Sequence, residues 1–372
     1  MKYCKRCILP NTRPGLIIET DGVCNACKGH DEKLSFDWDT RARQFSNLLQ
    51  QVKLLNRPFD CIVPVSGGKD STYQVVKCLE HDLHVLAITW KTPSRTEIGQ
   101  KNLENLISLG VDHIDYSVNP DVEREFTYKA LLNKGSVGVP MHFGLYIIPL
   151  RFAVALNVPL VVWGESPYME YGGSQEQRCS NSLDRTFLIS HGILQGTMIE
   201  DWIDTDLDSK DLEIYKLPTE EEFSRVGLQS IFIGYYFNWS PQESLEIALK
   251  HGFKVRDEGP KVGYYNFADI DCDLISVHHY FKWLKYGFTR LFDNLSLEIR
   301  NGNISREQAV EIVRKTGEQV PYDDIERLCE FLRISEQHFW EIAEKFRNTD
   351  IWHRERGTWI LRDFLIEDWH WR

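Results

Sequence analysis

The sequence has no apolar run that approaches the roughly 20 residues needed to span a lipid bilayer. Its first residues, Met1 to Cys7, also lack the apolar core of a secretory signal peptide. No internal repeat or low-complexity segment is visible. We therefore expect a globular protein of the cytoplasm, where the nine cysteines favour metal or thiol roles over disulfides.

Positive charge is scarce as well. The chain carries 43 Lys and Arg against 55 Asp and Glu, a net charge of −12 at pH 7. A protein that binds nucleic acid mainly by neutralising phosphates needs the opposite balance, so the composition disfavours that class while leaving small anionic substrates open. At 372 residues the chain is long enough for two or three domains.

Four cysteines stand close to the N-terminus as two pairs, Cys4-x2-Cys7 and Cys24-x2-Cys27, separated by sixteen residues. Two such pairs can close a tetrahedron of thiolates around Zn2+. A unit of residues 1–32 is too small to bury a core, so the spacing predicts a structural zinc ribbon. A redox role for either pair is the less favoured alternative, and His30 is interpreted as a bystander.

The stretch from Cys61 to Thr72 is the most informative part of the chain. An apolar, strand-forming run over residues 61–65 stops at Ser66–Gly68, and a helical pattern begins at Ser71. This order predicts a strand, a glycine turn and a helix. Glycines allow the backbone to approach an anion, and the N–H groups and dipole of the helix N-terminus attract it.

The side chains around this turn suit phosphate chemistry. Lys69 adds a positive charge, Ser66 and Ser71 add hydroxyls, and Asp70 can hold a magnesium ion beside phosphates. The pattern is not a Walker A loop, because Val63 and Asp70 occupy positions where that motif needs glycine and Ser or Thr.

Residues 66–71 instead resemble the SGGxDS signature of the PP-loop ATP pyrophosphatases, which cleave ATP between its α and β phosphates. The resemblance implies that Gly67 and Gly68 hold the pyrophosphate while a substrate oxygen becomes adenylylated. An ordinary glycine turn between a strand and a helix is the alternative.

Strand and helix patterns alternate around this turn, which predicts an α/β fold with a doubly wound, mostly parallel sheet of the PP-loop type. Strands are expected at residues 60–65, 84–90, 113–118, 159–165 and 228–237. Because ligands bind at the carboxyl ends of such strands, Trp90, Lys91, Gly164 and Glu165 should face the same crevice as the glycine turn.

A second informative segment is Gly164–Ser174, where a strand runs into a glycine-rich loop with tyrosines. Glu165 is predicted to lie beside the nucleotide, the alternative being that it caps the next helix. Trp90 and Gly164 complete the predicted nucleotide-binding set. Candidates for substrate binding are Lys91, Tyr171, Arg178 and Arg185.

The chain is expected to divide into a zinc ribbon (1–32), a linking helix that packs the ribbon onto the next domain (33–57), the PP-loop domain (58–238) and a C-terminal helical domain (239–372). The last begins at Ser240–Pro241, a good helix start. From there the pattern indicates helices to the end, among them one over residues 270–292.

The ordered combination of motifs resembles one family, the N-acetyl sugar amidotransferases of bacterial surface-polysaccharide synthesis. The resemblance covers essentially the whole chain and is carried by the four-cysteine unit, Pro64–Thr72, Gly164–Gly173, Lys285–Arg290 and Ile299–Gly302. It implies that the acetamido group of a nucleotide-activated N-acetyl sugar is converted to an acetamidino group at the expense of ATP.

The resemblance also implies a mechanism. The amide oxygen attacks the α-phosphorus, pyrophosphate leaves and ammonia displaces AMP. Lys69 would stabilise the leaving pyrophosphate, Asp70 would place Mg2+, and Glu165 would orient the adenylate or relay a proton. No glutaminase nucleophile is visible in this chain, so an ammonia-supplying glutaminase and a cyclase-like subunit are expected as partners.

Two other functions are compatible with the glycine turn. A PP-loop tRNA thiolase would need paired cysteines in the catalytic domain and a basic face, and this chain offers neither. A non-catalytic assembly subunit with a nucleotide pocket is the third interpretation, and the intact Lys69–Ser71 disfavours it.

Overall fold

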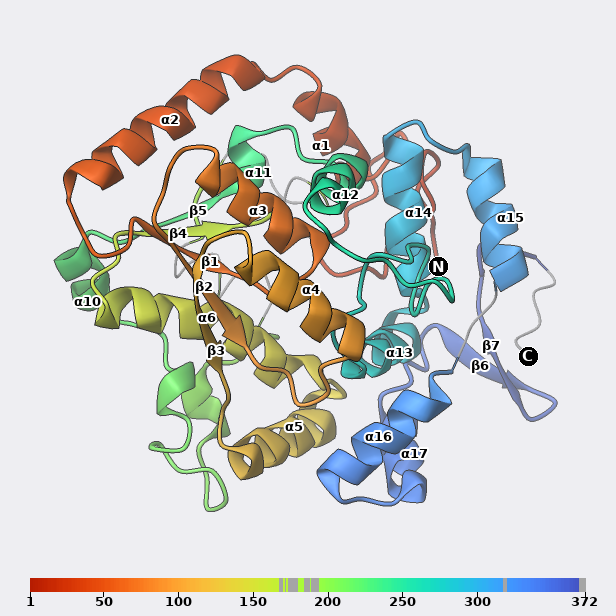
Figure 1. Cartoon of the computed structure of the whole chain (residues 1–372). Coiled ribbons are helices and arrows are strands. Elements are labelled where there is room, and N and C mark those ends of the chain that lie inside the picture. Colours follow the sequence, from red (N-terminus) through yellow and green to blue (C-terminus); the bar gives the residue numbers. More distant parts are fainter. Residues whose placement is uncertain are drawn as a thin grey trace.

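The computed structural model describes residues 1–166, 170, 172, 180–183, 188, 194–316 and 320–367. At its centre lies a five-stranded parallel sheet in the order β3-β2-β1-β4-β5 (Figure 1). The strands are β1 (Cys61–Pro64), β2 (Val85–Trp90), β3 (Asp112–Tyr116), β4 (Leu160–Trp163) and β5 (Gln229–Phe232). The predicted α/β class with a parallel sheet is confirmed.

Alternate residues of each strand enter two different cores. In β1, Cys61 and Val63 face a core shared with α2 (Trp38–Leu54), α3 (Lys69–Leu79) and α4 (Glu97–Ile107). Ile62 faces the other core, which holds α5 (Pro120–Lys134) and α6 (Gly138–Ala155). Both faces of the sheet are covered, which explains why the central strands β1, β2 and β4 read as mostly apolar runs.

β1 is the strand at which the direction of the chain reverses. Its neighbours are β2 on one side and β4 on the other, and Ile62 pairs with Val161 of β4. The helix α3 that follows β1 and the pair α5 and α6 that leads to β4 lie on opposite faces. The carboxyl end of β1 is therefore a topological switch point, the usual place for a ligand in such sheets.

Helix α6 is the most apolar helix of the fold. It has a mean hydropathy of 1.3 over its 18 residues, long and apolar enough by length and composition to cross a membrane. However, 61% of it is buried, and it packs on β1, β2 and β4. It is the core helix of one face of the sheet, and it begins at Gly138.

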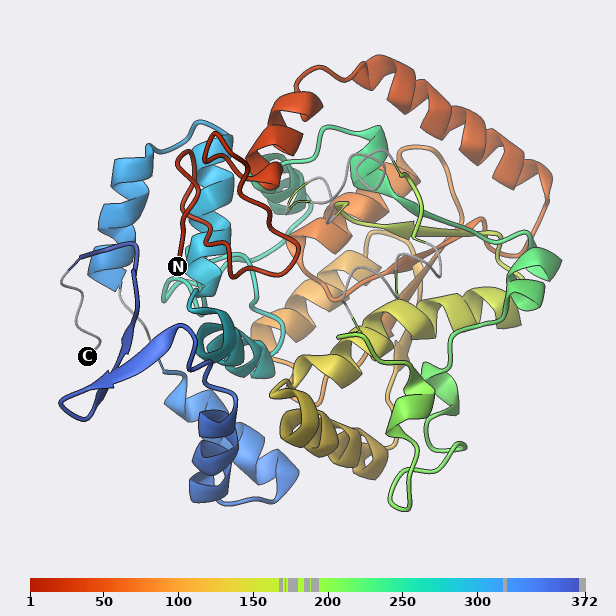
Figure 2. The same ribbon diagram turned by 180° about the vertical axis from the view of Figure 1, so that it is seen from behind.

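The N-terminal cysteines lie in a small unit with two antiparallel bridges, Tyr3 to Pro10 and Ile18 to Cys24, which is followed by α1 (Asn25–Lys33). This unit shares a core with α14 (Arg290–Arg300) and α15 (Arg306–Thr316). Both views show it beside these helices (Figure 1 and Figure 2). The linking helix was expected to pack the unit onto the sheet domain, whereas the unit itself packs on the C-terminal region.

The C-terminal region is mainly helical, as predicted, but its details differ. Besides α14 and α15 it contains α12 (Pro241–Lys250), α13 (Leu274–Tyr286), α16 (Tyr322–Leu332), α17 (Glu336–Lys345), β6 (Trp352–Glu355) and β7 (Thr358–Leu361). Before this region, 3-10 turns at Ile199–Trp202 and Glu213–Tyr215 and helix α10 (Glu220–Val226) lie between β4 and β5, and α11 (Ile233–Tyr236) follows β5.

Three expectations about elements were wrong. The helix expected over residues 270–292 is split at Gly287, whose φ of +70° ends α13. The pattern was read as helical to the end, but β6 and β7 form a hairpin whose turn has positive φ at Arg356 and Gly357. The strand expected over 228–237 stops at Phe232, where α11 begins.

Candidate functional site

The glycine turn after β1 is shaped by the close approach of helix α4 to Gly67. Gly67 has a φ of +88°, and a Cβ placed on it would lie 2.6 Å from the backbone nitrogen of Leu103 on α4. Only glycine meets both conditions. Gly68 returns to an extended conformation with φ −69° and ψ 167° and becomes the N-cap of α3.

The backbone N–H groups at the start of α3 are not capped by a side chain, because the N-cap residue is Gly68. The hydroxyls of Ser71 and Thr72 donate backward to the Gly68 carbonyl, at 2.9 and 3.1 Å. The Gly68 N–H points toward the Ser66 hydroxyl at 3.4 Å. This arrangement can bind an anion through N–H groups and the helix dipole.

Lys69 and Asp70 form an ion pair beside this turn. The Lys69 Nζ lies 2.6 and 2.7 Å from the two carboxylate oxygens of Asp70. Lys69 is only 5% exposed and lies above the rings of Trp239 and Phe267, 5.3 and 5.7 Å from their centres. The Trp239 indole N–H donates to Asp70 at 3.1 Å. The cation is thus enclosed by aromatic rings, while the carboxylate is partly open to solvent.

A segment from the C-terminal region forms the opposite wall. Burial raises the pKa of Asp271, and a hydrogen bond from Ser66 of the turn opposes that rise. The carbonyl of Asp271 accepts from the Thr96 N–H at 3.1 Å, and a Cβ on Gly99 would lie 2.7 Å from the Asp271 Cα. The start of α4 therefore holds this segment against the turn.

Glu165 follows the end of β4, as predicted. Gly164 packs against α3, where a Cβ would lie 2.4 Å from the Gln74 amide nitrogen. Burial, and then the negative charge of Asp70, raise the pKa of Glu165 to about 7, while Lys69 lowers it. The three residues predicted to be catalytic, Lys69, Asp70 and Glu165, are therefore electrostatic neighbours, and their chemical roles stay predictions.

The other predicted binding residues are less closely grouped. The Trp90 ring is 7% exposed and lies against Gly144 of α6, on the face of the sheet opposite α3. Lys91 is exposed, and its backbone N–H donates to the Tyr116 carbonyl at 2.8 Å. Their roles with a nucleotide or substrate stay predictions. The remaining candidates, Tyr171, Arg178 and Arg185, lie outside the described residues.

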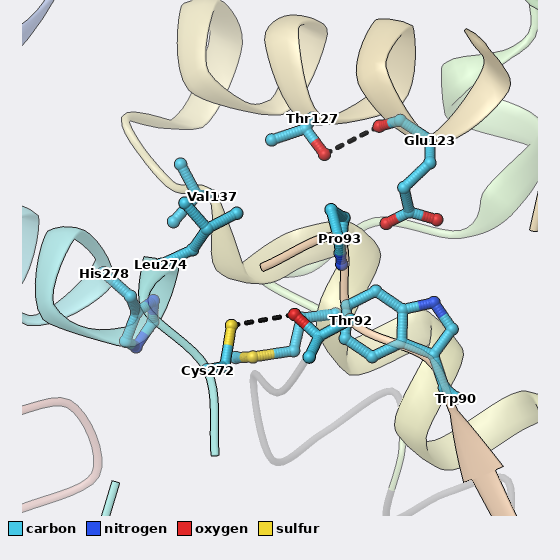
Figure 3. A pocket seen from close by; sticks show the side chains of 10 residues that line it. Trp90, Thr92, Pro93, Glu123, Thr127, Val137, Cys272, Leu274 and His278 are labelled. Carbon is cyan, nitrogen blue, oxygen red and sulfur yellow. Dashed lines mark hydrogen bonds between the residues drawn. The ribbon is translucent and has the colours of Figure 1, made fainter. Parts of the chain in front are cut away.

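Trp90 does line a small cavity beside the Asp271 segment (Figure 3). In this cavity burial raises the pKa of Glu123 to about 7, and the Tyr215 hydroxyl donates to its carboxylate. Thr92 and Cys272 close another wall, 2.8 Å apart. At about 10 Å3 the cavity has the space of a single water molecule, so it is too small for a substrate.

The four N-terminal cysteines fit a zinc ion. Their sulfur atoms lie within 4.8 Å of one another, with Cys4 to Cys27 at 4.0 Å and Cys7 to Cys24 at 3.8 Å. A tetrahedron with Zn–S bonds of about 2.3 Å has edges of about 3.8 Å. All four are buried, and the N–H groups of Cys7 and Cys24 point at the Cys4 sulfur. The donor set matches a closed structural site.

Sequence reasoning missed three residues of the site. Trp239, Phe267 and Asp271 lie after the sheet, in stretches without a recognisable motif. The only hint was their type, two aromatics and a carboxylate, which occur in many places along the chain. Their position depends on contacts between segments that are far apart in sequence.

Comparison with known proteins identifies the C-terminal region. Residues 261–365 match the family model described as "LPS biosynthesis protein WbpG-like, C-terminal domain". This confirms, for that region, the resemblance to proteins of bacterial surface-polysaccharide synthesis. The matched region includes Phe267 and Asp271, which lie at the glycine turn. The search of curated proteins found no match.

Solved structures similar to this chain include three synthetases. The NMN synthetase from Francisella tularensis is 16% identical, covers 56% of this chain and 97% of its own, and has a TM-score of 0.27. The NH3-dependent NAD synthetase from Campylobacter jejuni subsp. jejuni NCTC 11168 is 14% identical (60% and 99%, TM-score 0.30). The NAD+ synthetase from Burkholderia pseudomallei is 13% identical (61% and 91%, TM-score 0.27). Because these TM-scores are low, the fold is defined by the strand order and the glycine turn alone.

We expect the two glycines of the turn to respond differently to alanine. Gly67→Ala should lower the free energy of unfolding by about 2 kcal/mol or more, because it combines a positive φ with a clash against Leu103. Gly68→Ala should cost less than about 1 kcal/mol, since its φ is allowed and its new methyl meets only the Ser66 hydroxyl at 3.4 Å. Urea unfolding measures both. Equal losses would contradict the role given to the helix approach.

The purified protein should contain a single zinc ion per chain. Cys24→Ser should remove most of it and lower the thermal midpoint, because the small unit depends on the metal for its fold. Cys329→Ala, which removes a buried thiol from another part of the molecule, should keep the full zinc content. Elemental analysis gives the result, and a metal-free wild-type protein of unchanged stability would exclude the site.

Proposed function

We propose that this chain is an ATP-dependent amidotransferase that converts an acetamido group of a nucleotide-activated N-acetyl sugar to an acetamidino group. The reaction would proceed by adenylylation of the amide oxygen and attack by ammonia from a partner glutaminase. The observation that carries the proposal is the glycine turn, at which a segment of the WbpG-like region meets the start of α3. ATP chemistry and a polysaccharide-type domain would thus share one site.

Cleavage of ATP between its α and β phosphates suits this turn. The N–H groups of the first turn of α3, with the helix dipole, would receive the departing pyrophosphate. Lys69 would compensate the charge that develops on it. Because Lys69 is buried against the rings of Trp239 and Phe267, its charge would be screened less than it would be in water.

The Lys69–Asp70 ion pair would couple the binding of phosphate to the binding of Mg2+. An arriving phosphate would compete for Lys69, and the Asp70 carboxylate, more exposed than its partner, would then be available for Mg2+ beside the phosphates. The Trp239 indole would keep that carboxylate in place through its hydrogen bond. Mg2+, when bound, would neutralise part of the phosphate charge.

ATP is needed because an amide is a poor electrophile. Attack of the amide oxygen on the α-phosphorus would form a P–O bond, break the bond to the β-phosphate and release pyrophosphate. The oxygen would then leave with AMP when ammonia forms the new C–N bond. Glu165, whose pKa lies at about 7, would accept the proton that the nitrogen loses.

The ammonia would come from partner proteins, a glutaminase and a cyclase-like subunit, as the family resemblance implies. The cysteines outside the four-cysteine unit do not suggest a glutaminase in this chain. Within the described part, Cys61, Cys78, Cys272 and Cys329 are all buried, and burial raises the pKa of Cys272 to about 12. These are ordinary buried thiols, which also weakens the thiolase alternative.

The proposal predicts that AMP and pyrophosphate are released together over repeated turnovers only when a suitable nucleotide N-acetyl sugar and an ammonium salt are both present. Mass spectrometry should detect a sugar product in which NH has replaced one oxygen. Asp70→Asn should reduce turnover by at least about a hundredfold, because it removes the carboxylate charge at the phosphates.

Asp82→Asn, beyond the other end of α3, is the matched control for that variant and should retain wild-type turnover. Release of AMP without any change of the sugar would reject amidotransfer. Full turnover by folded Asp70→Asn would remove Asp70 from the mechanism.

Activity should also depend on the ionisation of Glu165. A base must be deprotonated, so kcat at constant free ammonia should rise with pH through an apparent pKa of about 7 and then level off. In Glu165→Gln this inflection should disappear. The free energy of unfolding changes with pH in the opposite direction. The folded state keeps the Glu165 proton up to about pH 7, whereas the unfolded state loses it near 4.5. The contribution of Glu165 to stability therefore decreases as the pH rises from 4.5 to 7. An unchanged pH profile in Glu165→Gln would reject the assignment.

A further inference from the structure

Helix α1 joins the four-cysteine site to the interior of the protein. It begins directly after Cys24, carries Cys27 in its first turn and ends at Lys33. Lys33 is only 5% exposed, which is rare for a lysine unless its charge is paired. Its Nζ donates to the Glu170 carboxylate at 2.9 Å and to the Trp239 carbonyl at 2.5 Å.

Trp239 connects this lysine to the glycine turn. Its carbonyl accepts from Lys33, while its indole N–H donates to the Asp70 carboxylate at 3.1 Å. Its ring lies beneath both Lys33 and Lys69, at 5.9 and 5.3 Å from the ring centre. One residue is therefore held by the end of α1 and in turn holds the residue proposed to bind magnesium.

Arg300, the last residue of α14, completes the connection from the other side. It is buried, its Nη2 donates to the Glu170 carbonyl at 2.9 Å, and its charge interacts with the thiols of Cys7 and Cys27. Its Nη1 is buried and has no hydrogen-bond partner among the described residues. A zinc ion with four thiolates carries a net negative charge, which explains why an arginine is buried at this place.

Glu170 lies at the centre of this arrangement. Its carboxylate is bonded to Lys33, at the end of the helix that carries Cys27, and its carbonyl to Arg300, whose charge interacts with the thiols. It belongs to the segment that follows β4 and contains Glu165, whose pKa its charge helps to raise. The same contacts thus reach both Asp70 and the neighbourhood of Glu165.

We propose that Arg300, Glu170, Lys33 and Trp239 are positioning residues that fix the Asp70 carboxylate, so that the metal-loaded four-cysteine unit is a structural part of the nucleotide site. The inference rests on the proposed ATP site, and it adds a defined path by which metal loading controls that site. A purely structural role would join the same segments without altering nucleotide binding. The two interpretations differ in what happens at Asp70.

Trp239→Phe tests the last step, because it keeps an aromatic ring but removes the N–H that reaches Asp70 together with the five-membered ring of the indole. The probe is α,β-methylene-ATP with Mg2+, followed by calorimetry on the full, zinc-loaded chain. Loss of a hydrogen bond to a charged group should weaken Mg2+-dependent binding on the order of tenfold. Trp202→Phe, which removes the N–H bond of another buried tryptophan to Thr197, should bind like wild type. Equal affinity in Trp239→Phe overturns the proposal.

The double variant Lys33→Met with Glu170→Gln tests the connection to α1. It neutralises both partners, so it leaves no unpaired buried charge that would prevent folding. It should keep its zinc and its fold but bind the probe on the order of tenfold more weakly. Lys28→Met is the control on the same helix, since Lys28 pairs only with the exposed Glu19 and Asp21. Wild-type affinity in the double variant contradicts the proposal.

Hydrogen exchange provides a readout that does not depend on ATP. Removal of zinc from the wild type by a chelator should speed exchange in residues 66–75 and 233–243 as well as in residues 1–30. In the double variant, exchange at 66–75 should no longer respond to the chelator. If only residues 1–30 respond in the wild type, the proposal fails. If the wild type shows the coupling but binds no ATP analogue, the proposed function fails instead.

Discussion

The turn between β1 and α3 depends on one steric constraint, the lack of space for any side chain at Gly67. The backbone of α4 passes so close to this residue that a methyl group would overlap Leu103. Because of that approach, α4 can hold the Asp271 segment through Thr96 while α3 directs its N–H groups outward. The backbone N–H groups proposed to bind an anion lie where three segments converge, and their positions are set by packing rather than by flexible side chains.

The two halves of the molecule supply different parts of this site. The sheet domain provides the turn, Lys69, Asp70 and Glu165, while Trp239 and the WbpG-like region enclose Lys69 and bond to Ser66. The field of a buried cation is weakly screened only if water is excluded, and its burial is stable only if its charge is balanced. Here the aromatic rings exclude water from Lys69, and Asp70 balances its charge. The C-terminal region is therefore a wall of the site and not an appendage.

The parts of the fold with local signals were predictable. The strand, glycine turn and helix at residues 61–79 and the two cysteine pairs each show their pattern within a few residues, and the structure has both. The β6 and β7 hairpin was missed because apolar aromatic residues fit a helix and a strand equally well over so short a range. Lys33, Trp239 and Asp271 could not be foreseen, since a solitary lysine, tryptophan or aspartate has no spacing to reveal a partner far away in sequence.

The shared core of the cysteine unit and α14 has a consequence for synthesis of the protein. Tyr3 packs on Phe292 and Phe364, with ring centres 6.4 and 6.3 Å away, so this segment is synthesised long before the surface on which it packs. Until then its apolar side remains uncovered, which is when aggregation threatens a nascent chain. Early capture of a metal by the four thiols would give this segment a compact shape during that wait.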